Sequence, residues 1–255
     1  MDSRYNTTII EQGITLFGLY RMDKKTSDGA MGNVWRVHHT GWNVYLAMKQ
    51  PKTEKFVSAE QQAVFKRECE AWIELGLHPH IVSCYYVRDI NGVPSIFAEW
   101  MDDGSLKDQI EDGRLYASDA SEKVLDVAIQ FARGLHYAHS HKLIHQDVKP
   151  GNLMLNTNGE VKVTDFGISR ARGGYTPAYC SPEQLLGKQE ITRRTDIYSW
   201  AVTVLEMYLG ERSWIAGPAV ELDCDGYLNK KMRVPMPMVR SPGSFSSGES
   251  SPEVE

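Results

Sequence analysis

Short runs of β-branched and aromatic residues, separated by turn residues, occupy much of the first hundred positions of the chain. Thr40-Gly41 separates the first two runs, and Asn91-Gly92 separates the last two. Runs bounded in this way are typical of β-strands joined as hairpins. The pattern therefore predicts an antiparallel sheet in this part of the chain. The predicted strands span residues 34–38, 44–49, 81–87 and 94–99.

Between the two predicted hairpins, residues 58–76 repeat apolar positions with the period of a helix. A capping-box pattern stands at the start of this segment and a glycine at its end, as is typical of helix boundaries. Glu68 lies on the apolar stripe, whereas Glu70 and Glu74 do not. A carboxylate on a buried face needs a cation, so we expect Glu68 to pair with a basic side chain. The stripe consists of Phe65, Cys69, Trp72 and Ile73.

Helical periodicity dominates the second half of the chain. Residues 119–139 place apolar side chains along one side, and residues 196–209 are apolar on nearly all sides. A helix of the second kind belongs in the middle of a lobe. Between these helices, residues 153–155 and 161–164 flank an Asn-Gly turn, which predicts another hairpin.

One stretch of this half carries most of the chemistry. Residues 143–152 place the carboxylate of Asp147, the ammonium of Lys149 and the carboxamide of Asn152 within six residues, and Asp165 follows thirteen residues after Asn152. These groups can orient a hydroxyl nucleophile, neutralise a moving phosphoryl group and hold a metal ion. The spacing therefore indicates phosphoryl transfer.

Both segments resemble the catalytic loop and the Asp-Phe-Gly segment of eukaryotic-type serine/threonine protein kinases. The resemblance covers residues 14–215 and implies an α+β, two-lobed fold with a small antiparallel sheet above a mainly α-helical lobe. It implies that the γ-phosphoryl group of ATP moves to serine or threonine hydroxyls of a protein substrate. Asp147 then accepts the hydroxyl proton, Lys149 offsets charge, and Asn152 and Asp165 hold Mg²⁺.

The predicted sheet also carries residues that resemble kinase motifs. Residues 27–34 are similar to the glycine-rich loop, with Ser27 at the first glycine, although alone they would indicate an ordinary hairpin turn. Lys49 ends a stretch similar to the family's Val-Ala-Ile-Lys strand, and the resemblance makes Glu68 its partner. Lys49 and Glu68 thereby join the implied catalytic set. The implied nucleotide-binding residues are Gly29, Gly32, Val34, Ala47, Lys49, Ala98, Glu99, Met101 and Met154.

Ala98 takes the position that guards the back of the nucleotide pocket in the family, and Met101 the position whose backbone binds adenine. Because alanine is small, we expect a deeper pocket than most kinases have.

Four further residues have roles implied by the resemblance. Thr176 together with Lys149 is the pattern of serine/threonine kinases, and Asp196 corresponds to the aspartate that anchors the catalytic-loop backbone. His145 is expected to pack against the Asp-Phe-Gly phenylalanine. Gln146 replaces an arginine that pairs with an activation-segment phosphate, so strong activation by such a phosphate is not expected. A metal site among the histidines near this loop is disfavoured, because cysteines and carboxylates at ligand spacing are lacking.

The resemblance becomes thin after Gly210, and the last helices of a kinase lobe are not recognisable. We therefore divide the chain into an N-lobe (1–98), a truncated C-lobe (99–234) and a Ser/Pro/Gly/Glu-rich tail (235–255) that is expected to be disordered. Apolar surface left on residues 196–209 leads us to expect a partner domain or chain that covers it.

Composition narrows the remaining choices. A net charge of -5 argues against nucleic acid as a partner, and no apolar run is long enough to span a membrane. Four scattered cysteines suit a reducing compartment, and we expect a cytoplasmic location. Two alternatives remain open. One is an ATP-binding scaffold whose catalysis is impaired by the short C-lobe; the other, which fits less well, is a kinase of small molecules.

Overall fold

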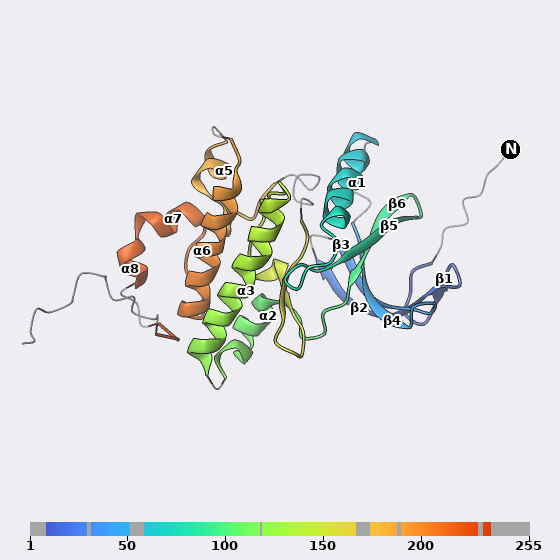
Figure 1. Cartoon of the computed structure of the whole chain (residues 1–255), viewed down its shortest axis with the longest axis horizontal. Coiled ribbons are helices and arrows are strands. Elements are labelled where there is room, and N and C mark those ends of the chain that lie inside the picture. Colours follow the sequence, from blue (N-terminus) through green and yellow to red (C-terminus); the bar gives the residue numbers. More distant parts are fainter. Residues whose placement is uncertain are drawn as a thin grey trace, which may run out of the picture.

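The computed structural model describes residues 9–29, 32–51, 59–117, 119–166, 174–187, 190–228 and 232–235. These residues form a lobe built on one β-sheet beside a lobe built on helices (Figure 1). The predicted α+β, two-lobed fold is confirmed.

The sheet of the first lobe has six antiparallel strands in the order β1-β2-β3-β4-β6-β5. Each predicted hairpin is present, and the turns fall where Thr40-Gly41 and Asn91-Gly92 predict them. The strands are β1 (Thr15–Leu16), β2 (Tyr20–Gly29), β3 (Gly32–His39), β4 (Val44–Gln50), β5 (Cys84–Ile90) and β6 (Val93–Glu99).

Helix α1 (Ala59–Glu74) packs against β5 (Figure 1). Its predicted apolar stripe faces the core, where Phe65, Cys69 and Trp72 are buried. The indole N–H of Trp72 donates to the Val82 carbonyl oxygen at 2.8 Å, which fixes the helix to the chain just before β5. The predicted start of this helix at residue 58 lies outside the described residues.

In the second lobe, α3 and α6 run side by side, and α7 and α8 lie on the far side of α6 from α3 (Figure 1). A small hairpin of β7 (Leu153–Leu155) and β8 (Val161–Val163) joins this lobe to the sheet lobe, as the Asn-Gly turn predicts. The helices are α2 (Leu106–Glu111), α3 (Ala120–Ser140), α5 (Pro182–Leu186), α6 (Arg193–Leu209), α7 (Gly217–Leu222) and α8 (Cys224–Leu228). Short 3₁₀ helices are η2 (Arg114–Tyr116), η3 (Pro150–Asn152) and η4 (Pro177–Tyr179).

Several element boundaries differ from the prediction. Strand β5 begins at Cys84, because the backbone before it pairs with β8 through Val82 N–H and the Val163 carbonyl oxygen at 2.9 Å. Asp119 has φ +61° and its side chain does not cap α3. Helix α6 begins three residues early, at Arg193, because Thr192 supplies the N-cap by accepting from a backbone N–H.

Less of the apolar surface of helix α6 is exposed than the sequence analysis leads us to expect. Its described residues are covered on one side by Trp214, Val220 and Tyr227, which precede or belong to α7 and α8. The expectation that this helix is left largely uncovered was therefore wrong for that side. Helices as short as α7 and α8 leave too few turns for a periodic signal.

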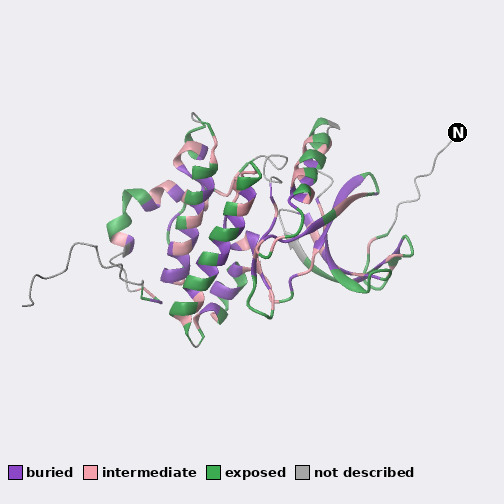
Figure 2. Ribbon diagram, viewed as in Figure 1, coloured by how far each residue is buried: buried purple, intermediate pink, exposed green. Residues whose placement is uncertain are grey.

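A continuous apolar core links the two lobes, and the buried faces of α1, α3 and α6 turn toward it (Figure 2). The same core therefore contains residues of both lobes. The largest fully buried side chains of this core include Phe65, Trp72, Ile81, Ile96, Phe131 and Phe166. Among the described residues, no helix combines the length and the apolar character that crossing a bilayer requires.

Candidate active site

Asp196, at the start of α6, organises the loop that carries Asp147. Its two carboxylate oxygens each accept a backbone N–H at 2.8 Å, from His145 and Gln146. His139 Nε2 lies 2.7 Å from the same carboxylate, which is completely buried. A buried carboxylate with several donors is stable only in one arrangement, so it fixes the loop backbone. The predicted anchoring role of Asp196 is confirmed.

His145 is a packing residue, as predicted. Its ring centroid lies 4.9 Å from that of Phe166, and its Nε2 lies 2.8 Å from the Thr164 carbonyl oxygen. The ring is fully buried. No group of three or more His, Cys, Asp or Glu side chains that could hold a metal ion occurs among the residues that the structure describes.

The carboxylate of Asp147 is the centre of a small polar network. Lys149 Nζ donates to Asp147 Oδ2 at 2.6 Å, and the Thr176 hydroxyl donates to Oδ1 at 2.7 Å. The Thr176 backbone N–H also donates to Oδ1, at 2.9 Å. Lys149 Nζ reaches the Thr176 hydroxyl oxygen at 2.7 Å, which closes a triangle of three side chains. The structure thus brings Lys149 and Thr176 together with Asp147, a contact that the sequence did not predict.

Asn152 supports the same loop from the other side. The side-chain Nδ2 of Asn152 donates to the backbone carbonyl oxygen of Asp147 at 2.7 Å. The backbone carbonyl oxygen of Asn152 accepts a hydrogen bond from the Thr164 N–H at 3.0 Å. Asn152 directly precedes β7 and Thr164 directly follows β8, so the hairpin places Asn152 next to the residue before Asp165. An amide and a carboxylate supply hard oxygen donors of the kind that Mg²⁺ prefers. The donor set therefore fits that ion.

Lys49 crosses from β4 to the end of β8. Its Nζ donates to Asp165 Oδ1 at 2.6 Å and to the Thr164 hydroxyl at 3.3 Å. Both charged side chains of the ion pair are mostly buried, with 16% and 13% of their surface exposed. Asp165 also has φ +65°, an uncommon backbone conformation for a non-glycine residue that often marks functional sites.

Glu68 lies on the half-buried side of α1, whereas Glu70 and Glu74 are exposed, as the stripe predicts. The expected pairing of Glu68 with Lys49 stays a prediction.

Small side chains line the junction of β4 and β6. Ala47 lies opposite Ala98 in the strand register, and Ala98 lies opposite Cys84 of β5. All three are buried, and burial raises the pKa of the Cys84 thiol to about 12, so the thiol stays protonated at neutral pH. Val34 lies opposite Lys49 on β3. The expected nucleotide residues Val34, Ala47 and Ala98 thus belong to adjacent strands.

The segment after β6 connects these strands to the helical lobe. Met101 is buried, and Met154 of β7 is half-buried and forms a bridge with Ser105. The Glu99 carboxylate accepts one hydrogen bond from each lobe. Lys162 Nζ donates to it at 2.6 Å, and the Ser83 backbone N–H donates at 3.2 Å. Glu99, the last residue of β6, therefore links the two lobes through its side chain.

Gly32 is required by the sheet itself. Its φ is +123°, and a Cβ at this position would lie 2.3 Å from the Gln50 carbonyl oxygen. Gly29 pairs with Gly32 at the tip of the β2–β3 hairpin. Ala30 and Met31 between them lie outside the described residues, so the glycine-rich loop stays a prediction.

By resemblance, residues 165–183 correspond to the activation segment of kinases; of these, residues 167–173 lie outside the described residues. Glu183 accepts a hydrogen bond from the Thr195 hydroxyl at 2.6 Å, which ties α5 to α6. Gln184 Nε2 donates to the Gln146 carbonyl oxygen at 2.7 Å and so links the segment to the catalytic loop. Sequence reasoning missed Thr195 and Gln184, as well as Thr164 and His139, because no local spacing marks them.

Comparison with known proteins agrees with this geometry. A model of the protein kinase domain family matches residues 20–240. A probable serine/threonine-protein kinase of Streptomyces coelicolor is 32% identical over 215 residues, which is 78% of this chain and 31% of that protein. The serine/threonine-protein kinase PknA of Mycobacterium tuberculosis is 32% identical over 224 residues, which is 82% of this chain and 51% of that protein. The chain thus spans from a third to a half of the length of these two relatives.

Solved structures show the same similarity. The crystal structure of the Mycobacterium tuberculosis PknI kinase domain superposes with a TM-score of 0.68 at 28% sequence identity. The match covers 80% of this chain and 77% of that one.

Proposed function

Because the chain belongs to the protein kinase family, we propose that it transfers the γ-phosphoryl group of ATP to serine and threonine hydroxyls of proteins. The arrangement around Asp147 carries the proposal. Its carboxylate is held by Lys149, and a threonine hydroxyl already lies within hydrogen-bond distance of it. The Asp147 carboxylate therefore accepts an aliphatic hydroxyl as a hydrogen-bond donor.

The proposed reaction assigns one role to each charged side chain. Asp147 orients the acceptor hydroxyl and takes its proton, and the hydroxyl oxygen forms a bond to the γ-phosphorus while the bond from the γ-phosphorus to the β,γ-bridging oxygen of ATP breaks and ADP leaves. Lys149 offsets negative charge on the phosphoryl group, and Lys49 holds the α- and β-phosphates. Asn152 and Asp165 would hold Mg²⁺, which screens phosphate charge when bound. Catalysis then consists mainly of positioning and electrostatics.

The nucleotide site that we propose lies between the sheet lobe and the hairpin β7–β8. Ala47 and Val34 would cover the adenine from the sheet side and Met154 from below, with Met101 offering backbone hydrogen bonds. Gly29 and Gly32 would bring backbone N–H groups to the phosphates, and Glu68 would orient Lys49. Burial of Ala47, Ala98 and Met101 at the junction of the lobes supports this placement.

We further propose the division into an N-lobe (1–98), a C-lobe (99–234) and a tail (235–255). The end of β6 at Glu99 supports the first boundary. A cytoplasmic location is proposed because all four cysteines are free thiols, which suits a reducing compartment. We also propose a protein partner for the part of α6 that α7 and α8 leave open.

The proposal is tested by phosphate transfer from radiolabelled ATP with Mg²⁺, both to the protein itself and to a generic basic protein. We expect label on serine or threonine with the wild type and none with Asp165→Ala. An ATP-binding scaffold would instead show a Mg²⁺-dependent thermal shift with ATP and no label. Full transfer by Asp147→Ala would contradict the assigned roles.

A further inference from the structure

Gln146, the residue before Asp147, has a left-handed backbone conformation. Its φ is +68°, which is uncommon for a residue with a Cβ and persists only where surrounding contacts hold it. Both polar groups of its backbone are bound by buried side chains of other elements. The N–H donates to Asp196 Oδ1 at 2.8 Å, and the carbonyl oxygen accepts from Gln184 Nε2 at 2.7 Å. The conformation is therefore fixed from two sides.

The peptide group between Gln146 and Asp147 sets the position from which the Asp147 side chain extends. Its oxygen is the one that Gln184 binds, and its N–H donates to His145 Nδ1 at 3.2 Å. A peptide group is planar, so two bonds at its opposite ends fix its orientation and with it the Cα of Asp147. Gln184 therefore acts on Asp147 through the backbone and not through its carboxylate.

The side-chain amide of Gln184 has one orientation that satisfies its neighbours. Its Oε1 accepts the Ser181 N–H at 3.1 Å, in a capping box at the start of α5. Its Nε2 must then face an acceptor, and the Gln146 carbonyl oxygen is that acceptor. The residue is only 8% exposed, so water competes little for either bond. The start of α5 is thereby joined by an oriented amide to the loop that carries Asp147.

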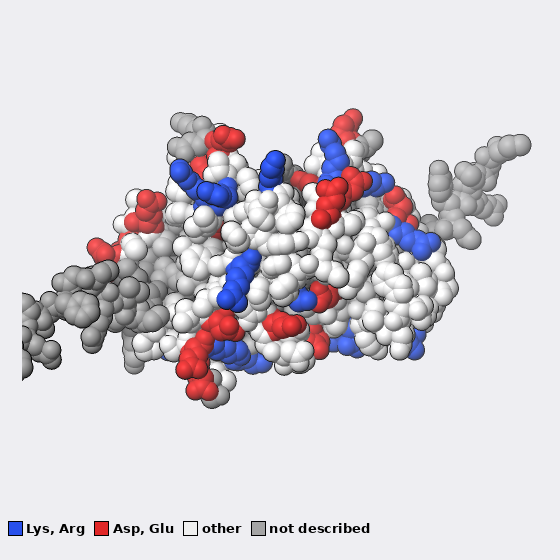
Figure 3. All heavy atoms as spheres, in the orientation of Figure 1, with Lys and Arg blue, Asp and Glu red and all other residues white. Residues whose placement is uncertain are grey.

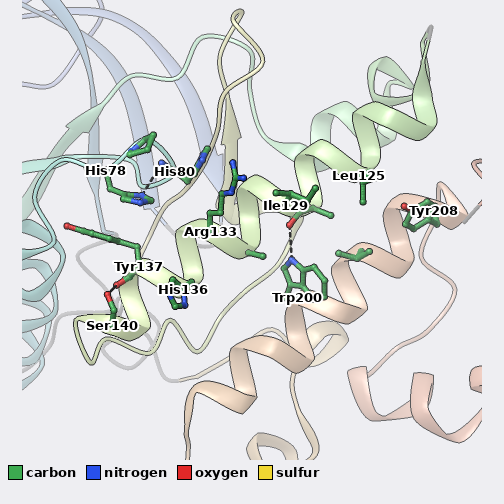
Figure 4. A pocket seen from close by; sticks show the side chains of 14 residues that line it. His78, His80, Leu125, Ile129, Arg133, His136, Tyr137, Ser140, Trp200 and Tyr208 are labelled. Atoms are coloured by element: carbon green, nitrogen blue, oxygen red, sulfur yellow. Dashed lines mark hydrogen bonds between the residues drawn. The ribbon is translucent and has the colours of Figure 1, made fainter. Parts of the chain in front are cut away.

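Asp196 is a fixed second support for this loop, because α6 is itself bonded to its neighbours. Trp200, one turn after Asp196, donates its indole N–H to the Ala128 carbonyl oxygen of α3 at 3.2 Å (Figure 4). The hydroxyl of Thr195, next to Asp196, donates to the Glu183 carboxylate of α5 at 2.6 Å. The two helices that hold the loop are therefore bonded to each other.

A bound anion is another means of fixing such a loop, and it needs a cation. Gln146 is uncharged. Among the described residues on the face drawn in Figure 3, Lys and Arg side chains are interspersed with Asp and Glu rather than gathered in one patch. The neutral amide of Gln184 instead supplies the donor, so no bound phosphate is needed to place Asp147.

We propose that Gln184 is a positioning residue for Asp147, whose amide holds the preceding peptide group so that the carboxylate meets the acceptor hydroxyl. The inference rests on the proposed phosphate transfer. Loss of the amide donor should lower kcat and leave the KM for ATP unchanged, because the nucleotide-binding residues that we propose belong to other segments.

Two substitutions separate the bond to Gln146 from the cap of α5. Gln184→Glu keeps an oxygen for the Ser181 N–H but places a second oxygen, in place of the N–H donor, against the Gln146 carbonyl oxygen. Gln184→Met keeps the length of the side chain and removes both bonds. In phosphate transfer to a generic basic protein we expect both variants to lower kcat by about 10- to 100-fold. Full activity of Gln184→Glu would show that only the cap matters and would overturn the proposal.

Gln130→Met is the matched control. Gln130 is also a buried glutamine that accepts a backbone N–H, from Val161 at 2.8 Å, and donates to a backbone carbonyl oxygen, that of Gly159 at 3.2 Å. These bonds join α3 to the turn end of the β7–β8 hairpin. The control should lower the melting temperature much as Gln184→Met does, but keep the kcat of the wild type. An equal loss of kcat in both would reflect lost stability alone and would overturn the proposal.

Hydrogen exchange tests the geometry independently of activity. The backbone N–H groups of residues 145–147 all donate to side chains, so their exchange reports how firmly the loop is held. We expect exchange in this segment to be about tenfold faster in Gln184→Glu than in the wild type, and unchanged in Gln130→Met. If the wild type transfers no phosphate, the proposed function fails, and this measurement still decides whether Gln184 fixes the loop. Unchanged exchange in Gln184→Glu would overturn the proposal.

Discussion

The hydroxyl of Thr176 lies 2.7 Å from Asp147 Oδ1 and 2.7 Å from Lys149 Nζ. It therefore holds two opposite charges of the catalytic loop in one geometry, although 27 residues separate it from Lys149 along the chain. A hydrogen bond to a charged group contributes about 1.5–3 kcal/mol. If Asp147 acts on an incoming hydroxyl as we propose, the segment that contains Thr176 fixes the geometry of that carboxylate.

We predict that Thr176→Val lowers kcat by about 10- to 100-fold, because the loss of about 1.4–2.7 kcal/mol of positioning energy translates into such a factor. The variant keeps the shape of the side chain and removes only the hydroxyl. Steady-state kinetics with a generic basic protein measure the effect. Thr176→Ser, which restores the hydroxyl, should retain most of the activity; equal activity of valine and serine variants would contradict the role.

The ion pair between Lys49 and Asp165 gives a second prediction. Lys49→Met leaves the mostly buried Asp165 carboxylate without that ammonium, and we expect the free energy of unfolding to fall by about 1–3 kcal/mol. The double variant Lys49→Met/Asp165→Asn removes the uncompensated charge and should recover much of the loss. Urea denaturation measures both effects.

Measuring phosphate transfer by the same two variants distinguishes the contribution of the ion pair to stability from its contribution to catalysis. Both variants should be inactive, because stability alone does not replace the ammonium or the carboxylate. If the double variant is no more stable than Lys49→Met, the ion pair does not contribute as proposed.

Ala98 gives a prediction about ligand size. Its partners in the strand register are the small residues Ala47 and Cys84. We predict that purine analogues with a bulky substituent on the exocyclic amine inhibit the wild type, and that Ala98→Met raises their inhibition constants at least about tenfold, because the longer side chain fills the space. The KM for ATP should change little. Equal inhibition of the two proteins would refute a deep pocket.

The sequence led to predictions for those site residues that lie close together along the chain. Asp147, Lys149 and Asn152 share one short segment, so their resemblance to a kinase motif could be found within that segment. The contact between Lys49 and Thr164 joins residues 115 positions apart and leaves no trace in either segment. Long-range contacts of this kind depend on how the hairpin β7–β8 meets the sheet.

The fold was predicted where periodicity was strong, as in α3 and α6. The short helices α7 and α8 were missed, and with them the cover that Trp214 gives to one side of α6. The cap at Thr192 was also missed, because its effect depends on backbone geometry and not on residue type alone.

Glu206 gives the last prediction, on pH. This carboxyl on α6 is buried and accepts a hydrogen bond from the Tyr179 hydroxyl at 2.7 Å. Burial raises its pKa above the ordinary value near 4.5. The folded protein therefore binds the proton more tightly than the unfolded chain, and stability falls as pH rises from the unfolded pKa through the raised folded pKa. Ionisation of Glu206 thus works against folding at neutral pH.

Glu206→Gln removes this titration and can still accept the Tyr179 hydrogen bond through its amide oxygen. We predict that the variant gains stability relative to the wild type as pH rises from about 4.5 to 7.5, with the smallest difference at the acidic end. Urea denaturation at several pH values measures the trend. Tyr179→Phe serves as the control, since it removes the donor but leaves the buried carboxyl, so its stability should still fall over this pH range. A constant difference between Glu206→Gln and wild type would show that the carboxyl does not titrate differently in the folded state.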